Sequence, residues 1–213
     1  MTYRTQGPRR LFFLLKFCAQ IKAFILVLQY LHKNNNKEHD MRRILGIDPG
    51  KEGGLSIIDE QFNLIASMPM PAILGIKNKR KSKKVSKLRV DPLQVHEFIS
   101  RYNPEVAVVE LVGSMTGDSG ASMFSFGDSY GVVRSLAEAL CPQVIYAKPQ
   151  DWKRFQGLSG LSKEQVAEVA YEVFGEEQIY GKPYKRNGQV KRAVRDGISD
   201  SLMIAKYGVR FLE

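Results

Sequence analysis

The chain has 213 residues, of which 44% are hydrophobic and 25% are charged, a balance typical of a globular protein with its own core. Its net charge of +10 favours an anionic partner, either nucleic acid or an acidic membrane surface. Only two cysteines occur, with no CxxC motif and no histidine in ligand spacing. This argues against a disulfide framework and a structural zinc site, and favours a reducing compartment.

Residues 1–40 are predicted to be an N-terminal extension. Residues 11–31 are apolar, but two lysines interrupt them, which disfavours a membrane span, and no small-residue cleavage site of a signal peptide is obvious. A polar, asparagine-rich linker follows, and Met41 stands directly before the first predicted strand. We therefore expect 1–40 to be an upstream extension or a loosely attached helix without chemistry of its own, and 41–213 to be the functional domain.

The elements predicted after Met41 alternate between short apolar runs and amphipathic stretches. The predicted strands are 43–47, 54–59, 63–69, 105–111 and 143–147. The predicted helices are 91–102, the second half of 121–140, a helix that starts in 148–155, 162–175 and 194–212. Asp91 and Ser162 are predicted N-caps, and Gly175 is a predicted C-cap. The order of these elements predicts an α/β fold, a mixed sheet with helices on its faces.

Most of the excess positive charge of this domain lies in one segment. Residues 77–89 hold eight lysines and arginines and no acid. A run this dense repels itself and gains most from contact with a polyanion. The alternative is a solvated loop with no partner. A second basic segment, 183–192, is predicted to be a loop that either touches DNA or is only a mobile surface loop.

Acids end two of the predicted strands. Asp48 follows the first strand, and Glu110 follows four apolar residues of the fourth. If these strands are adjacent and parallel, the two carboxylates lie side by side, at the strand ends where ligand sites form in such sheets. The alternative is that Asp48 is only a turn former, since Pro49 and Gly50 come next.

The last predicted helix carries two more acids, Asp196 and Asp200, which lie four residues apart and therefore share one face. Each has an alternative role, Asp196 as an N-cap and Asp200 as an exposed acid. Four converging carboxylates would raise one another's pKa values unless cations bound between them. Carboxylate oxygens suit Mg²⁺ or Mn²⁺, and two such ions can hold both the attacking water and the leaving oxygen of a phosphoryl displacement.

Five motifs in this order resemble the RuvC-like Holliday-junction resolvases, most closely the branch found in bacteriophages and prophages. They are ILGIDPGKEGGLSIID, VAVVELVGSMTG, FSFGDSYG, AKPQDWK and RDGISDSLMIAKYG, and the resemblance covers about 41–210. It implies an RNase H-like fold with a five-stranded mixed sheet of order 3-2-1-4-5, a homodimer, and cleavage of four-way DNA junctions that depends on two Mg²⁺ or Mn²⁺ ions.

The same resemblance implies that Asp48, Glu110, Asp196 and Asp200 are the catalytic and metal-binding residues. In the bacterial enzymes the two helix acids lie three apart, whereas here they lie four apart and Gly197 holds the other place. The spacing resembles the phage branch. If the protein is of this type, it is expected in the cytoplasm of a bacterial host cell, with no membrane partner.

DNA contacts are predicted from charge and aromatic character, because phosphates bind lysine and arginine and unstacked bases lie on aromatic rings. The predicted contacts are Lys51, Lys79, Arg80, Lys81, Lys83, Lys84, Phe124, Lys148, Lys153, Lys185 and Arg186. Trp152 and Phe126 are expected in the core. Gly127 and Gly131 are expected to allow close helix packing, against the sheet or against a partner subunit.

Two other functions fit parts of the sequence. A fragment of a sugar-kinase-like or actin-like ATPase also opens with a strand and an Asp-Gly turn, but 41–213 leaves little room for the two domains such proteins need. A catalytically inactive junction-binding protein is the other alternative, although all four acids are present. Within the nuclease interpretation, the substrate is either the four-way junction alone or a wider set of branched DNA.

Overall fold

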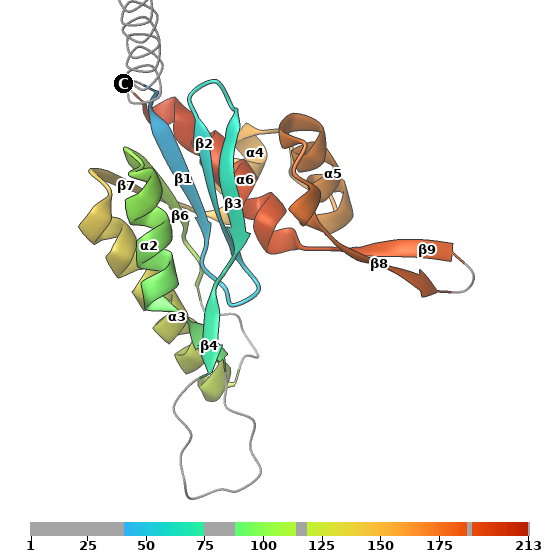
Figure 1. Ribbon diagram of the computed structural model, residues 1–213, viewed down its shortest axis with the longest axis horizontal. Coiled ribbons are helices and arrows are strands. Elements are labelled where there is room, and N and C mark those ends of the chain that lie inside the picture. The colour runs from blue at the N-terminus through green and yellow to red at the C-terminus, as the bar shows by residue number, and fades with distance from the viewer. Residues whose placement is uncertain (1–40, 75–87, 114–118, 187–188, 213) are drawn as a thin grey trace, which may run out of the picture. The chain divides into compact units, whose positions relative to one another are not determined.

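The computed structural model describes residues 41–74, 88–113, 119–186 and 189–212. A five-stranded mixed sheet forms their centre (Figure 1). Its strands are β1 (Arg43–Asp48), β2 (Gly54–Asp59), β3 (Leu64–Pro69), β6 (Val106–Glu110) and β7 (Gln143–Ala147). Their order is β3-β2-β1-β6-β7. Counted along the chain this is 3-2-1-4-5, so the predicted fold class and strand order are confirmed.

The pairing of β1 places two acids at one edge of the sheet. β1 pairs antiparallel with β2 and parallel with β6. In the parallel pair, Ile47 lies opposite Val109, so Asp48 and Glu110 are the next residues of neighbouring strands. The expectation that the first and fourth strands are adjacent and parallel is therefore confirmed.

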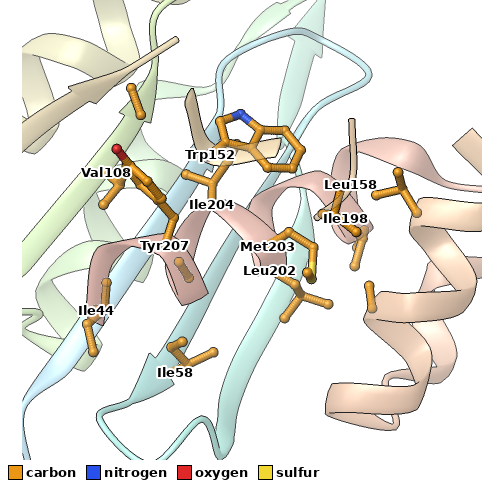
Figure 2. Close-up of a cluster of buried hydrophobic side chains, with 14 of the residues drawn as sticks. Ile44, Ile58, Val108, Trp152, Leu158, Ile198, Leu202, Met203, Ile204 and Tyr207 are labelled. Atoms are coloured by element: carbon orange, nitrogen blue, oxygen red, sulfur yellow. The ribbon is translucent and has the colours of Figure 1, made fainter. Parts of the chain in front are cut away.

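Helices cover both faces of the sheet. They are α2 (Pro92–Tyr102), α3 (Gly120–Leu140), α4 (Pro149–Phe155), α5 (Lys163–Phe174) and α6 (Asp196–Gly208), with short 3₁₀ helices η1 (Glu177–Ile179) and η2 (Val209–Phe211). Buried residues of α2 and α3 pack with Leu45 and Ile47 of β1. Buried residues of α4, α5 and α6 pack instead with Ile44 of β1 and Val108 of β6 (Figure 2).

This division follows the two-residue period of the strands. Ile44 points toward α6, so Gly46 and Asp48 share that face of β1. By the same alternation Glu110 shares the α6 side with Val106 and Val108. Both strand-end acids therefore lie on the face that α6 covers.

Small residues allow α6 to approach the sheet very closely. A Cβ atom at Gly46 would overlap the backbone of Ser201 and Ala205, and one at Gly197 would overlap the backbone of Glu52 and Gly53. A buried hydrogen bond of 2.7 Å joins the hydroxyl oxygens of Ser56 in β2 and Ser201 in α6. The backbone of the acid-bearing helix is thus fixed against β1 and β2.

The predicted helix ends are largely confirmed. Asp91 accepts hydrogen bonds from the backbone N–H groups of Leu93 and Gln94, and Ser162 caps α5 in a reciprocal arrangement with Gln165. Two helix boundaries were wrong. The helix predicted over 194–212 is α6 over Asp196–Gly208, because Val194 ends a strand and Val209–Phe211 form a 3₁₀ helix. α3 is helical from Gly120, not only in its second half.

Two short two-stranded sheets were not predicted. β4 (Ala72–Leu74) pairs with β5 (Leu88–Val90), and β8 (Tyr180–Arg186) pairs with β9 (Gln189–Val194). The prediction of a loop over 183–192 was therefore wrong, because its described parts pair as strands. Nor do Gly127 and Gly131 pack against the sheet, since a Cβ atom at either would meet nothing within 4 Å. Among the described residues no helix is long and apolar enough to cross a membrane.

Candidate active site

Asp48 and Glu110, at the ends of β1 and β6, form the centre of a cluster of partly buried acids. Burial, and then the carboxylates of Glu110 and Asp200, raise the pKa of Asp48 to about 7, although the backbone N–H of Gly50 lies 3.5 Å from its Oδ1. Burial also raises the pKa of Glu110. Each ionised carboxylate is therefore disfavoured while no cation lies nearby.

The first two turns of α6 add Asp196 and Asp200. Burial raises the pKa of Asp200 to about 6; Lys153 and Lys163 oppose this shift, while Glu110 and Asp196 reinforce it. Asp196 in turn contributes to the raised pKa of Asp48. Acids from two strands and one helix therefore act on one another electrostatically.

Trp152 orients the carboxylate of Glu110. Its indole Nε1–H donates a hydrogen bond of 3.0 Å to Glu110 Oε1, and this bond lowers the pKa of Glu110 against the effect of burial. Trp152 is fully buried, as predicted for a core residue. It packs near Ile204 of α6 (Figure 2), so the same side chain fills the core and holds an acid of the site.

Two lysines bring positive charge to the cluster. The Lys163 ammonium, at the first turn of α5, forms an ion pair with Asp196, and this hydrogen bond raises the pKa of Lys163. Lys153 lies 5.0 Å above the Trp152 ring, measured from Nζ to the ring centroid. It lowers the pKa values of both Glu110 and Asp200.

The donor chemistry fits a hard divalent cation, because the cluster offers carboxylate oxygens and no thiol or imidazole. Within the described parts of the chain, however, no group of three or more His, Cys, Asp or Glu side chains is arranged so that it could hold a metal ion. Two of the four carboxylates have side-chain partners: Asp196 pairs with Lys163, and Glu110 accepts from Trp152. Assignment of metal ligands therefore stays a prediction.

The predicted DNA-contacting residues fall into four groups. Lys51 and Lys148 are exposed near the ends of β1 and β7, and Lys153 is half-buried beside the acids. Phe124 on α3 is 82% exposed, whereas Phe126 is partly buried and stacks on Tyr130. Lys185 is exposed on β8, where Arg186 is the last residue. Lys79, Arg80, Lys81, Lys83 and Lys84 lie outside the described residues, as does the extension 1–40.

Sequence reasoning missed two contacts of the acids. It placed Trp152 in the core without recognising its hydrogen bond to Glu110, since pairs far apart in sequence leave no local pattern. It also did not single out Lys163. A cation in the first turn of a helix opposes the helix dipole, so a lysine at that position was a usable sign of a nearby acid.

Comparison with protein families finds one match in sequence. The family model described as crossover junction endodeoxyribonuclease RuvC matches residues 44–179, more than half of the chain. This range contains β1, β6 and α5, and it ends directly before β8. A search of curated proteins finds no match.

Solved structures of Holliday junction resolvases resemble the chain more distantly. RuvC of T. thermophilus in complex with a Holliday junction substrate is 20% identical, with a TM-score of 0.49 over 80% of this chain and 96% of that one. The yeast mitochondrial Holliday junction resolvase Ydc2 is 14% identical, with a TM-score of 0.49 over 80% of this chain and 78% of that one. The fowlpox virus resolvase is 16% identical, with a TM-score of 0.35 over 80% and 99% of the two chains. The family match, and not these likenesses, carries the assignment.

Proposed function

The chain belongs to the RuvC family of crossover junction endodeoxyribonucleases, structure-selective enzymes that resolve Holliday junctions, and on this premise we propose how its own residues carry the reaction. Dependence on divalent metal ions is general in this family. We assign catalysis and metal binding to Asp48, Glu110, Asp196 and Asp200, and propose Mg²⁺ or Mn²⁺ as the ion, with two ions per site.

One observation carries this assignment. Burial first, and then the neighbouring acids, raise the pKa of Asp48 to about 7, so carboxylates from two strands and one helix lie close enough to act on one another in a site largely shielded from water. Divalent ions bound there would neutralise the carboxylates, act as Lewis acids on a phosphate and activate water for in-line displacement. The ATPase alternative has no comparable support, since the family match covers both strands that bear the acids.

The neighbouring side chains would prepare the acids for this role. Trp152 fixes one oxygen of Glu110 and leaves the other free to bind a cation. Lys163 holds Asp196 in the metal-free protein, and we expect this ion pair to loosen when a divalent ion competes for the carboxylate. Lys153 lies close enough to Glu110 and Asp200 to lower both of their pKa values, and we propose that its ammonium group contacts the scissile phosphate beside these acids.

We propose branched DNA as the substrate, including four-way junctions, three-way junctions and flaps, and a homodimer as the active form. Two active sites related by a two-fold axis suit a junction with two equivalent strands to cut. Phosphate contacts are proposed for Lys51, Lys148 and Lys153, with Phe124 stacking on an unpaired base.

The test is a cleavage assay on synthetic four-way, three-way, flap and linear duplex DNA with Mg²⁺ or Mn²⁺. Metal-dependent cuts in branched substrates, and none in linear duplex, are the expected result. Cutting of all substrates alike would indicate a non-specific nuclease. Binding without cutting in either metal would support the inactive junction-binding protein instead.

A metal titration gives a second readout that does not depend on cleavage. Trp152 is the only tryptophan of the chain, and it touches Glu110. Its fluorescence should therefore change on addition of Mn²⁺ and saturate, and the response should require higher metal concentrations in Asp200→Asn. A fluorescence signal indifferent to metal would remove Glu110 from the proposed ligand set.

A further inference from the structure

The β8–β9 hairpin lies between the part of the chain that matches the family and the helix that bears two of the acids. The family match ends at residue 179, β8 begins at Tyr180, and α6 begins at Asp196. Figure 1 shows both strands running away from the central sheet and the helices around it. The hairpin therefore lies outside the range that the family match covers, and the match gives it no role.

Residues 180–194 are strongly basic. They contain five cations, Lys182, Lys185, Arg186, Lys191 and Arg192, and no acid. In the described structure, the ammonium groups of Lys182, Lys185 and Lys191 form no ion pair or hydrogen bond. A hairpin that only faces solvent does not require such an excess of positive charge. Like charges close together on a two-stranded ribbon repel one another and destabilise it unless a polyanion binds.

Contacts at its base hold the hairpin in place. Arg192 Nη1 donates a hydrogen bond of 3.0 Å to Glu177 Oε2, and the guanidinium lies 5.4 Å from the centroid of the Tyr180 ring. The Tyr171 hydroxyl of α5 donates to the other oxygen of Glu177 at 2.9 Å. Arg195 N–H donates to the carbonyl of Ile179 at 2.7 Å, which closes the base. The hairpin is anchored, and a ligand bound to it would be oriented relative to α5 and α6.

Each face of the ribbon beyond this base combines a cation with an exposed apolar side chain. Cross-strand partners share a face, and Tyr184 lies opposite Lys191 while Lys185 lies opposite Val190. Tyr184 is 44% exposed and Val190 is 66% exposed. A ribbon with this pattern can meet phosphates with its lysines and base edges or methyl groups with its apolar residues.

We propose that the β8–β9 hairpin is a duplex-binding ribbon that enters a DNA groove in one arm of the branched substrate. The major groove of B-DNA, about 12 Å wide, admits a two-stranded ribbon. The inference rests on the proposed function for its substrate, and it adds a contact with double-stranded DNA away from the crossover. Only Arg195 separates β9 from α6, so no loop lies between the ribbon and the acid-bearing helix. A DNA arm bound by the ribbon would therefore be held in a fixed position relative to that helix.

The test compares two double variants that remove equal charge. Lys185→Ala/Lys191→Ala removes cations from both faces of the ribbon. Arg101→Ala/Arg134→Ala removes two exposed cations from α2 and α3, on the other face of the sheet, and serves as the matched control. Affinity for a four-way junction is measured by fluorescence anisotropy across a range of salt concentrations. Thermal unfolding verifies that all variants fold.

The ribbon variant should bind at least about tenfold more weakly, and its slope of log affinity against log salt should be shallower by about 1.8 for each ribbon bound to the junction, or about 0.9 per lost phosphate contact. The control should keep the wild-type slope. A hydroxyl-radical footprint on each arm that a ribbon contacts should be present with wild type and absent with the ribbon variant. An unchanged slope and footprint would overturn the proposal, as would an equal loss in the control.

Tyr184→Ala separates groove entry from charge attraction alone. Loss of the Tyr184 ring should weaken binding several-fold. Because the substitution changes no charge, the slope of log affinity against log salt should stay the same. Wild-type affinity in this variant would refute insertion into a groove. If the wild-type protein binds no junction at all, the proposed function is refuted. This outcome differs from failure of the ribbon proposal, in which the wild type binds junctions and the ribbon variants bind equally well. Loss of binding to a protein partner, with DNA binding intact, would assign the ribbon a different role.

Discussion

The two segments on either side of Arg195 differ in almost every physical respect. Before it, the β8–β9 hairpin is exposed, basic and anchored only at its base through Arg192 and Glu177. After it, α6 is buried along most of its length, with its backbone pressed against Gly46 and Gly54. We infer that the chain separates two demands, because acids that must be positioned closely need a packed scaffold, whereas attraction of DNA needs only exposed charge.

This difference makes the two regions respond differently to substitution. A change in the helix region should alter the relative positions of the acids or the stability of the fold. A change in the hairpin should alter DNA affinity and its dependence on salt.

The largest effect is expected from Asp48→Asn, which removes a charge from the centre of the acid cluster and keeps the shape of the side chain. Cleavage of a four-way junction should fall by about 10³-fold or more, equivalent to about 4 kcal/mol, while junction binding is retained. Single-turnover cleavage and anisotropy measure the two quantities. Glu97→Gln, an exposed acid on α2, is the control. Normal cutting by Asp48→Asn would remove the acid cluster from the mechanism.

Gly46→Ala should lower the free energy of unfolding by about 3 kcal/mol, since the added methyl group overlaps the backbone of α6 at Ser201. Gly127→Ala is a sharp control, because a Cβ atom there meets nothing within 4 Å and alanine favours a helix. Urea unfolding followed by circular dichroism measures both. Equal stability of the two variants would contradict the close packing of α6.

In the absence of metal, the protein should become less stable as the pH rises. The pKa of Asp48 is raised to about 7 and that of Asp200 to about 6, both above the value of about 3.9 in an unfolded chain. The folded state therefore binds more protons between these values, and the free energy of unfolding falls as pH rises through this window. We expect a loss on the order of 2 kcal/mol, because coupled groups share the shift.

Urea unfolding in EDTA at about pH 5 and about pH 8 measures this effect. The drop should be smaller in Asp48→Asn, which is expected to be the more stable protein at neutral pH. Stability that rises with pH in wild type would show that the acids are not held in a mutually unfavourable arrangement.

Trp152→Phe should have the smallest effect of the four. The ring still fills the core, but the hydrogen bond to Glu110 is lost, which we expect to weaken Mn²⁺ binding about tenfold, or about 1.4 kcal/mol. Isothermal titration calorimetry measures the affinity. In a Glu110→Gln background, Trp152→Phe should reduce Mn²⁺ affinity by a smaller factor, because the two residues act through one hydrogen bond. If the two substitutions reduce Mn²⁺ affinity independently, Trp152 does not act through Glu110.

Local pattern in the sequence was sufficient to predict the strands of the central sheet, and the family resemblance supplied their order. The apolar runs of β1 and β6 each end in an acid, so Asp48 and Glu110 were predicted to lie side by side if these strands are adjacent and parallel, and caps defined α2 and α5. The Trp152–Glu110 bond and the Lys163–Asp196 pair could not be predicted in this way. Both join segments whose approach depends on how α4 and α5 pack, which no local period encodes.

The hairpin was missed for a different reason. Asn187-Gly188 in the sequence is a strong signal for a two-residue hairpin turn, but its flanks are basic instead of alternating apolar and polar. A ribbon that does not bury a face against a core lacks the pattern by which strands are usually found. The turn residues and the basic flanks, and not hydrophobic periodicity, were the sequence features that could have indicated this hairpin.

The hydroxyl pair between Ser56 and Ser201 has a consequence for the alignment of α6 along the sheet. Small residues recur every four positions on its inner face, at Gly197, Ser201 and Ala205, so a slip of one turn, about 5.4 Å, would bring another small side chain opposite Gly46. Such a slip would bring one of the two acids, Asp196 or Asp200, into the place of the other and carry the second one turn away. It would also leave the buried Ser56 hydroxyl unpartnered, at a cost of about 1–3 kcal/mol. One hydrogen bond between two serines thereby specifies the register in which the helix presents its acids.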